Sequence, residues 1–305
     1  MGVQILDTTA VNTVDIKDFN LKRVGDVNEN GKIDIRDMVR MAKGLKGTET
    51  VDELVGDYDN STAFDGADIT AVREKILNTD KLADVLRGKT VSILGDSIST
   101  YDGYNNNIFS NTTTSNNAVC YYNTIKWDYM TVNDTYWKQI IDITETRLLV
   151  NNAWSGSSIA RQGGANRGVQ LHDNYGYYEG KTPDIILVHY GTNDCRSQND
   201  IVAFEKYYDE MIEAIKNEYS DAEIYLFTFP LYTEDIFESD TAKETLINFN
   251  SIIRTTAEKY TCQLVDLYQL ENYDLLSFDD VHPNKAGMDA ITDTLYNVMY
   301  KQYLE

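Results

Sequence analysis

The stretch Gly95-Asp96-Ser97-Ile98-Ser99 directly follows an apolar run, residues 91–94, that is typical of a short buried strand. A second polar stretch, Gly191-Thr192-Asn193-Asp194, follows a similar run at residues 185–188. Further along, the chain reads Asp279-Asp280-Val281-His282-Pro283. Sites in open parallel α/β sheets collect at the carboxyl ends of strands. We therefore expect these polar stretches to converge at one edge of a parallel sheet.

The three stretches supply the groups that acyl transfer requires. A serine hydroxyl needs a base to take its proton, and Ser97 and His282 are the candidates for these roles. Asp279, three residues before the histidine, is the candidate that holds the imidazole tautomer. Asp280 is a competing carboxylate, and the spacing favours Asp279. The side-chain amide of Asn193 is a candidate donor to the oxyanion.

A fourth stretch, from Asn151 to Gly156, follows the apolar run 148–150, and a glycine there lets a backbone N–H approach a ligand closely. With these four stretches, residues 88–302 resemble the SGNH (GDSL) hydrolase family, whose four blocks contribute Ser, Gly, Asn and His. The first block has isoleucine where the family name has leucine. The resemblance implies an α/β fold, a three-layer α/β/α sandwich with a five-stranded parallel sheet of the flavodoxin-like kind.

The resemblance also implies roles for individual residues. Ser97 matches the nucleophile, His282 the base and Asp279 the carboxylate that pairs with it. The oxyanion donors that match are the N–H of Ser97, the N–H of Gly156 and the side-chain amide of Asn193. The chemistry of the family implies no cofactor for catalysis.

Residues 26–37 have the spacing of a twelve-residue loop that surrounds a hard cation such as calcium, and the pattern recurs in residues 57–68. The side-chain candidates at positions 1, 3, 5, 9 and 12 are Asp26, Asn28, Asn30, Asp34 and Asp37 in the first loop and Asp57, Asp59, Ser61, Asp65 and Asp68 in the second. Lys32 and Ala63 stand at position 7, which supplies a backbone carbonyl. A helical pattern follows each loop, which predicts a small all-α N-terminal module of two calcium loop-helix repeats.

The duplicated pattern resembles a type I dockerin, a module that docks enzymes to cohesin-bearing scaffolds. The resemblance implies structural calcium and a cohesin-bearing scaffoldin as partner, although Thr62 stands where glycine usually makes the sharp turn. No Pro/Thr/Ser-rich spacer follows, so packing on the enzyme as a calcium-stabilised appendage is the alternative. We predict the dockerin-like module at residues 1–80, a short linker at 81–87 and the hydrolase domain at 88–305.

Composition limits the partners and the compartment. The chain has 305 residues and a formal net charge of −22, which argues against nucleic acid and anionic membrane surfaces. No apolar stretch reaches the length of a membrane span. The start has no signal-peptide pattern, and the dockerin-like module favours a secreted protein whose signal has been removed. Three cysteines without metal-type spacing imply no disulfide framework.

Aromatic and amide side chains surround the predicted site. Residues 100–134 are rich in Asn, Thr and Tyr, and Trp154 lies two residues before Gly156. Because flat aromatic faces suit sugars better than long acyl chains, Tyr101 and Trp154 are the candidate substrate-binding residues. We predict a secreted serine esterase that removes acetyl or similar short acyl groups from plant cell-wall polysaccharide through an acyl-enzyme on Ser97. The alternatives are a lipase, arylesterase or thioesterase, and an inactive glycan-binding or scaffold component.

Overall fold

The structure is a computed structural model in which the chain divides into two compact units, with the boundary between Ile69 and Thr70. The described residues are 24–30, 32–59, 61–104, 120–122, 130–162, 181–196, 200–230, 240–270, 276–279 and 281–305. Within these ranges, none of the helices combines the length and the apolar character that a bilayer span requires.

The larger unit is built on a five-stranded parallel sheet, as predicted, with the strand order β2-β1-β3-β4-β5. The strands are β1 (Thr90–Gly95), β2 (Arg147–Asn151), β3 (Ile185–His189), β4 (Glu223–Phe227) and β5 (Gln263–Val265). The order reverses at β1, which has β2 on one side and β3 on the other. Such a switch point is where open α/β sheets place their sites.

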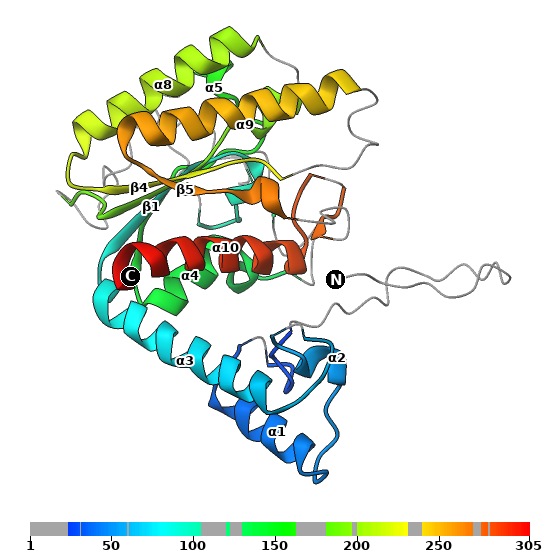
Figure 1. The fold of residues 1–305 in the computed structure, drawn as a ribbon. Coiled ribbons are helices and arrows are strands. Elements are labelled where there is room, and N and C mark those ends of the chain that lie inside the picture. Colours follow the sequence, from blue (N-terminus) through cyan, green and yellow to red (C-terminus); the bar gives the residue numbers. More distant parts are fainter. Residues whose placement is uncertain are drawn as a thin grey trace, which may run out of the picture. The chain divides into compact units, whose positions relative to one another are not determined.

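Helices cover both faces of this sheet (Figure 1). They are α8 (Ile201–Glu218) and α9 (Asp240–Tyr260) on one face, and α4 (Tyr136–Thr144) and α10 (Lys285–Leu304) on the other. Alternate strand residues point to opposite faces. Ile93 accordingly packs in the core cluster with α10, and Leu94 packs in the cluster with α8 and α9. The predicted three-layer α/β/α sandwich is confirmed.

Helix α3 (Gly66–Leu86) runs through most of the segment that was predicted as a linker, residues 81–87. Leu82 and Leu86 are fully buried and belong to the same core cluster as α4 and α10. Their i, i+4 spacing continues an apolar stripe beyond Ile76, where the predicted helical pattern ended. The linker prediction is therefore corrected, because these leucines bury their side chains in the larger unit.

The smaller unit contains one helix after each predicted calcium loop. Its described helices are α1 (Ile35–Leu45), α2 (Glu53–Gly56) and the first turn of α3. Asp34 caps α1 by accepting a hydrogen bond from the Arg36 N–H at 2.8 Å. The Gly25 N–H donates to the Val55 carbonyl at 2.7 Å. This hydrogen bond therefore joins the segment before the first loop to the segment before the second loop.

Candidate functional site

Ser97 lies directly after β1, at the start of a single 3-10 turn (Ser97–Ser99). The Thr100 hydroxyl donates to the Ser97 carbonyl at 2.7 Å, and the Ile98 N–H donates to the Asp96 carboxylate at 3.2 Å. These local bonds satisfy the polar groups of the turn. They hold the serine just past the carboxyl end of β1, at the point where the strand order reverses.

His282 and Asp279 form a chain of hydrogen bonds with Ser97. His282 Nε2 lies 2.8 Å from Ser97 Oγ, and His282 Nδ1 lies 2.8 Å from Asp279 Oδ2 and 3.0 Å from Asp279 Oδ1. Because an ionised carboxylate only accepts hydrogen bonds, Nδ1 carries the proton and Nε2 accepts from the serine hydroxyl. This is the tautomer that a general base for Ser97 requires. The competing Asp280 lies outside the described residues.

A tight turn explains why the carboxylate stands three residues before the histidine. Asp279 Oδ1 accepts hydrogen bonds from the Val281 N–H at 3.3 Å and from the His282 N–H at 2.8 Å. An aspartate that bonds to the backbone two and three residues ahead closes an Asx-type turn. The spacing therefore brings the carboxylate and the imidazole to the same side of one turn.

The start of α10 holds this turn in place. The Asn284 side chain caps the helix by accepting from the Gly287 N–H at 3.0 Å, and the Asn284 N–H donates to the Leu276 carbonyl at 2.9 Å. A Cβ on Gly287 would lie 2.0 Å from the Leu276 carbonyl oxygen, so only glycine permits this close approach. The helix N-terminus thereby fixes the loop that carries His282.

The Asp279 carboxylate is ionised at neutral pH. Burial opposes its ionisation, but hydrogen bonds from the ring and backbone of His282 and from the Tyr121 hydroxyl outweigh burial and lower the pKa of Asp279 well below its usual range. A carboxylate that stays charged stabilises the imidazolium that forms when His282 takes the serine proton.

Asp96 joins the first two sequence stretches. Its carboxylate is fully buried and accepts hydrogen bonds from the Ile98 N–H and, at 3.1 Å, from the Thr192 N–H. Burial raises the pKa of the Asp96 carboxyl, and these hydrogen bonds oppose the shift. Thr192 begins the short helix α7 (Thr192–Arg196). Asp96 therefore fixes the serine turn to the polar stretch that follows β3.

Asn193, one predicted oxyanion donor, contacts the loop that carries another, Gly156. Asn193 Nδ2 donates to the Ser157 carbonyl at 2.9 Å, and the preceding Gly156 has a φ of +75°, which favours glycine. Asp194 caps the short helix α5 (Ile159–Gln162) by accepting from its first two N–H groups at 2.8 and 3.0 Å. The stretch after β3 therefore anchors the loop after β2. The oxyanion roles themselves stay predictions.

The two predicted substrate-binding residues differ in their exposure. Trp154 is a partly exposed residue, and its backbone N–H donates to the Gly95 carbonyl at 3.1 Å, beside the end of the strand that precedes Ser97. Tyr101 is 4% exposed, packs in the apolar core and donates through its hydroxyl to the Met130 carbonyl at 3.1 Å. The prediction that Tyr101 contacts substrate is therefore corrected, because its ring is covered by core side chains.

Tyr121 belongs to the aromatic stretch expected beside the site, and its contact with His282 and Asp279 was not predicted. Its ring stacks on the His282 imidazole with the centroids 3.4 Å apart and an angle of 8° between the planes. Its hydroxyl donates to Asp279 Oδ2 at 3.0 Å. In the sequence, Tyr121 is one of several tyrosines in a polar stretch. No local spacing marks it, because the hydrogen bond joins residues 158 positions apart.

The two predicted calcium loops share one hydrogen-bond framework. In each loop the N–H groups at positions 3 and 9 donate to the two oxygens of the carboxylate at position 12, Asp37 or Asp68. The N–H at position 5 donates to the carboxylate at position 1, and the N–H at position 11 donates to the carboxylate at position 9. The sequence repeat is thus a repeat of backbone conformation.

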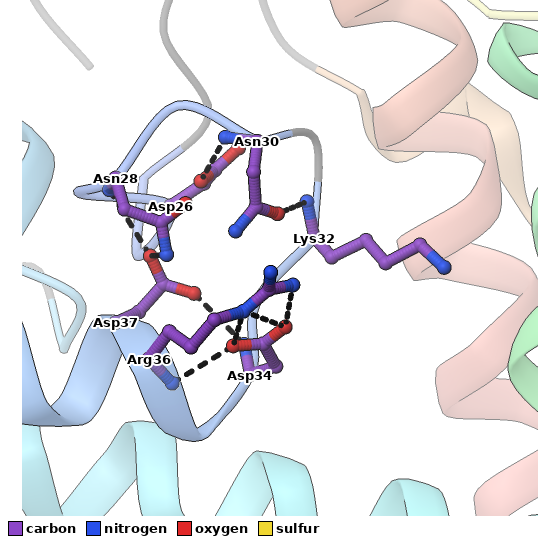
Figure 2. Close-up of polar contacts among 7 residues, drawn as sticks. All are labelled: Asp26, Asn28, Asn30, Lys32, Asp34, Arg36 and Asp37. Carbon is purple, nitrogen blue, oxygen red and sulfur yellow. Dashed lines mark hydrogen bonds and ion pairs between the residues drawn. The ribbon is translucent and has the colours of Figure 1, made fainter.

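Figure 2 shows the first loop. Asp37 is fully buried and Asp26 is nearly so, whereas the Lys32 side chain points away from the loop oxygens. Arg36 pairs with Asp34, its Nε lying 3.0 Å from both carboxylate oxygens, and this hydrogen bonding lowers the pKa of the Asp34 carboxyl. One candidate ligand of the first loop therefore already has a cationic partner.

The second loop gathers more negative charge. Carboxylate oxygens of Asp57, Asp59 and Asp68 lie within 4.8 Å of one another. Thr62, at the usual glycine position, has a φ of +74°, the left-handed conformation that favours glycine, so the sharp turn forms despite the threonine side chain. Carboxylate, amide and hydroxyl oxygens suit calcium. The residues of both loops therefore fit a hard divalent cation.

A family model described as GDSL-like Lipase/Acylhydrolase matches residues 89–299. Among solved structures, a Bacteroides ovatus protein classed as a GDSL-like lipase has 22% identity and a TM-score of 0.51, over 70% of this chain and 99% of its own. An acetyl-xylooligosaccharide esterase from Geobacillus has 17% identity and a TM-score of 0.49, over 70% and 95%. A Pseudoalteromonas psychrotrophic esterase has 17% identity and a TM-score of 0.47, over 71% and 100%. No curated protein shows a significant match.

The family match covers more than half of the chain and includes the whole sheet, the serine turn and the His282 turn. At identities this low, the solved structures bear on the fold alone, and the Bacteroides ovatus structure supports the observed α/β architecture. The match and the geometry at Ser97 agree on the same kind of protein. The chain belongs to the GDSL-like lipase/acylhydrolase family.

Proposed function

We propose that this protein is a serine esterase that hydrolyses acetyl or similar short-chain esters on carbohydrate. One observation carries the proposal: hydrogen bonds run without a break from Ser97 Oγ through the His282 imidazole to Asp279, and each is 2.8 Å long. Nucleophile, base and orienting carboxylate are therefore already in contact, in the arrangement by which a serine is activated for acyl transfer. Membership of an acylhydrolase family supports the same reaction class.

In the first half-reaction, His282 Nε2 takes the Ser97 proton as Oγ forms a bond to the ester carbonyl carbon. The carbonyl oxygen becomes an oxyanion, which the N–H groups of Ser97 and Gly156 and the Asn193 amide stabilise. The bond from carbon to the alcohol oxygen then breaks, and His282 gives its proton to that oxygen. Asp279 stays ionised and stabilises the imidazolium.

In the second half-reaction, water attacks the acyl-enzyme. His282 takes a proton from the water as its oxygen bonds to the acyl carbon, and a second oxyanion forms. The bond between that carbon and Ser97 Oγ breaks, the proton returns to Oγ, and the carboxylic acid leaves. The same imidazole therefore acts as base and then as acid in both halves.

The support for a carbohydrate substrate comes from an aromatic residue near the serine. Trp154 is partly exposed, and its backbone N–H donates to the Gly95 carbonyl at 3.1 Å, beside the end of the strand that precedes Ser97. Flat aromatic faces pack well on the C–H faces of sugar rings, and an indole group also offers a hydrogen-bond donor. The dockerin-like pattern of the N-terminal loops supports a secreted enzyme that acts on plant cell-wall polysaccharide.

Acyl release from 4-nitrophenyl acetate, 4-nitrophenyl octanoate and acetylated xylan, measured for the wild type beside Ser97→Ala, tests this proposal. We expect acetate to be preferred over octanoate, acetate to be freed from xylan, and all three activities to disappear in Ser97→Ala. A preference for octanoate without release from xylan would indicate a lipase, arylesterase or thioesterase. A folded wild type that turns over none of the three would favour the glycan-binding or scaffold role.

We also propose that the two N-terminal loops bind structural calcium and that the module docks to a cohesin-bearing scaffoldin. The matched hydrogen-bond frameworks and the converging carboxylates of the second loop support the calcium sites. The residues at loop positions 1, 3, 5, 7, 9 and 12 would hold the ions, with Lys32 and Ala63 contributing their carbonyls. A bound cation neutralises carboxylates that otherwise repel one another.

Calcium titration by calorimetry, with thermal unfolding in calcium and in chelator, tests the first part. We expect two sites and a chelator-sensitive transition of the smaller unit, while hydrolysis of 4-nitrophenyl acetate persists in chelator. Immediate loss of hydrolysis on chelation would contradict the separation of the two units. Binding to a recombinant type I cohesin only in calcium supports docking, whereas no binding in calcium favours the stabilising appendage.

A further inference from the structure

Tyr121 is linked by hydrogen bonds to the two parts of the chain that carry Ser97 and Asp279. Its backbone N–H donates to Thr100 Oγ1 at 2.8 Å, and the Thr100 hydroxyl in turn donates to the Ser97 carbonyl at 2.7 Å. Its side-chain hydroxyl donates to Asp279 Oδ2 at 3.0 Å. One residue therefore ties the serine turn to the turn that carries the carboxylate.

Aromatic rings contact the His282 imidazole from two directions. The Tyr121 ring lies face to face with it, at a centroid distance of 3.4 Å and an angle of 8°. Tyr122 lies edge-on at 6.4 Å and 80°, and its hydroxyl donates to the Pro283 carbonyl at 2.8 Å. A face contact restricts tilting of the imidazole, and an edge contact restricts rotation within its plane. The two adjacent tyrosines therefore limit the orientations available to the base.

The Asp279 carboxylate needs an additional partner because its side chain is 46% exposed, against 10% for the His282 side chain. An exposed carboxylate exchanges hydrogen bonds with water and, by itself, orients an imidazole weakly. The oxygen that Tyr121 contacts, Oδ2, is also the oxygen nearest to His282 Nδ1, at 2.8 Å. The tyrosine hydroxyl therefore holds in place the oxygen on which the imidazole tautomer depends.

We propose that Tyr121 is a positioning residue of this active site that acts on Ser97 through His282 and Asp279. For its kinetic consequences, the inference rests on the proposed esterase function. The ring fixes the plane of the base and the hydroxyl fixes the carboxylate, so proton transfer from the serine starts from one geometry. A residue that acts in this way affects kcat and leaves KM nearly unchanged.

Two substitutions distinguish the contribution of the Tyr121 ring from that of its hydroxyl. Tyr121→Phe removes the hydroxyl and keeps the stacked ring, and Tyr121→Leu removes both while keeping a large apolar side chain. Tyr207→Leu is the matched control, because Tyr207 is a 36%-exposed tyrosine on α8 whose ring contacts Lys206. Thermal unfolding of each variant establishes that the proteins compared are folded, and the nearly isosteric phenylalanine keeps the test valid if the leucine variant unfolds.

With 4-nitrophenyl acetate, Tyr121→Leu should lower kcat about 10- to 30-fold with KM within about 2-fold, and Tyr121→Phe should recover kcat to within about 3-fold of the wild type. The acid limb of the pH–rate profile should move in both Tyr121 variants and stay in place in Tyr207→Leu. Unchanged kcat in Tyr121→Leu would overturn the proposal. A higher KM with unchanged kcat and pH profile would also overturn it, because Tyr121 would then be a substrate contact.

Nitrogen-15 NMR of the imidazoles tests the positioning without any substrate. The chain has three histidines, so the His282 signals can be assigned by comparison with His282→Gln. His282 should show one Nδ1–H tautomer in the wild type and a mixture of tautomers in Tyr121→Leu. If the wild type hydrolyses no ester but this difference is present, the proposed function fails and the positioning role stands. A single Nδ1–H tautomer in Tyr121→Leu would overturn the positioning role even in an active enzyme.

Discussion

The turn that carries Asp279 and the two N-terminal loops both hold their carboxylates by hydrogen bonds from backbone N–H groups. The other groups around these carboxylates differ. Asp279 accepts hydrogen bonds from backbone N–H groups two and three residues ahead, and Asp68 accepts from three N–H groups of its own loop. At Asp279, the carboxylate also meets a ring N–H and a tyrosine hydroxyl. At Asp68, the carboxylate lies near those of Asp57 and Asp59.

This difference shows that the surroundings of a carboxylate decide what it does. Hydrogen-bond donors around Asp279 outweigh its burial and lower its pKa, so the charge is available to stabilise an imidazolium. Several carboxylates that face one another repel, and a divalent cation removes that repulsion. We therefore expect the larger unit to depend on single hydrogen-bond partners and the smaller unit to depend on calcium.

The largest expected effect comes from removing one negative charge in each unit. Asp279→Asn should lower kcat about 10³- to 10⁴-fold, because an amide donor facing Nδ1 favours the wrong tautomer of His282. Asp68→Asn should remove calcium binding from the second loop and leave kcat unchanged. Hydrolysis of 4-nitrophenyl acetate and calcium titration, made on the same preparations, measure both effects.

Asp37→Asn is the matched control, because it makes the same change at the same position of the first loop. It should remove one calcium site and, like Asp68→Asn, leave hydrolysis intact. A fall in kcat for Asp68→Asn as large as for Asp279→Asn would contradict the independence of the two units. Wild-type kcat in Asp279→Asn would exclude Asp279 from the mechanism.

Local spacing explains which parts of the molecule could be predicted from the sequence. A twelve-residue pattern predicted two matching loops, and a three-residue separation predicted the pairing of Asp279 with His282. Both depend on bonds between a side chain and the backbone a few residues away. The buried strand before Ser97 followed in the same way, from an apolar run that ends in polar residues.

Contacts between distant residues that no motif marks could not be predicted. Tyr121 reaches Asp279, and Asp96 reaches Thr192, through bonds that only the folded sheet brings into range. The helical extent of α3 was underestimated for a related reason: Leu82 indicates a helix only once the core that buries it is known. Tyr101 was assigned to the substrate because a tyrosine in a polar stretch does not reveal that it is buried.

Asn193→Ala tests the next largest effect, on the oxyanion side of the site. It should lower kcat about 10²- to 10³-fold with little change in KM, because the amide stabilises charge that exists only in the transition state. Calcium binding should not change. Since Asn193 also donates to the Ser157 carbonyl, thermal unfolding should be measured beside kcat to register any loosening of that loop. An unchanged kcat would remove Asn193 from the proposed mechanism.

His189 should make the larger unit sensitive to pH. It is fully buried between Phe227, stacked at 4.9 Å, and Tyr136 at 5.6 Å, and neither ring nitrogen has a hydrogen-bond partner within the described part of the chain. Burial lowers the pKa of His189 from 6.5 to about 3. Between these values the unfolded chain binds one more proton than the folded chain. Stability should therefore fall as the pH decreases from 6.5, by about 2–3 kcal/mol at pH 4.5.

Denaturant unfolding from pH 7 to pH 4.5, for the wild type and His189→Phe, measures this dependence. The phenylalanine keeps the stacking and has no nitrogen to protonate, so the variant should lose less stability over this interval. All three histidines lie in the larger unit. Calcium should therefore shift the transition of the smaller unit and leave the difference between wild type and variant unchanged. Equal pH dependence in the two proteins would show that His189 does not control it.

The smallest effect should come from Thr62, at the glycine position of the second loop. Its φ of +74° is unfavourable for a residue with a Cβ, and Gly31 stands at the equivalent position of the first loop. Thr62→Gly should stabilise the smaller unit by about 0.5–1 kcal/mol, since relief of the strain exceeds the added entropy of the unfolded chain.

Denaturant unfolding in chelator isolates this effect from calcium binding, and Thr62→Ala is the matched control. Alanine keeps the Cβ that clashes in the left-handed conformation, so it should stabilise the unit much less than glycine does. The Thr62 N–H, which donates to Asp57 Oδ2 at 2.9 Å, is present in all three proteins. Equal stability of the glycine and alanine variants would mean that the turn carries no strain from its side chain.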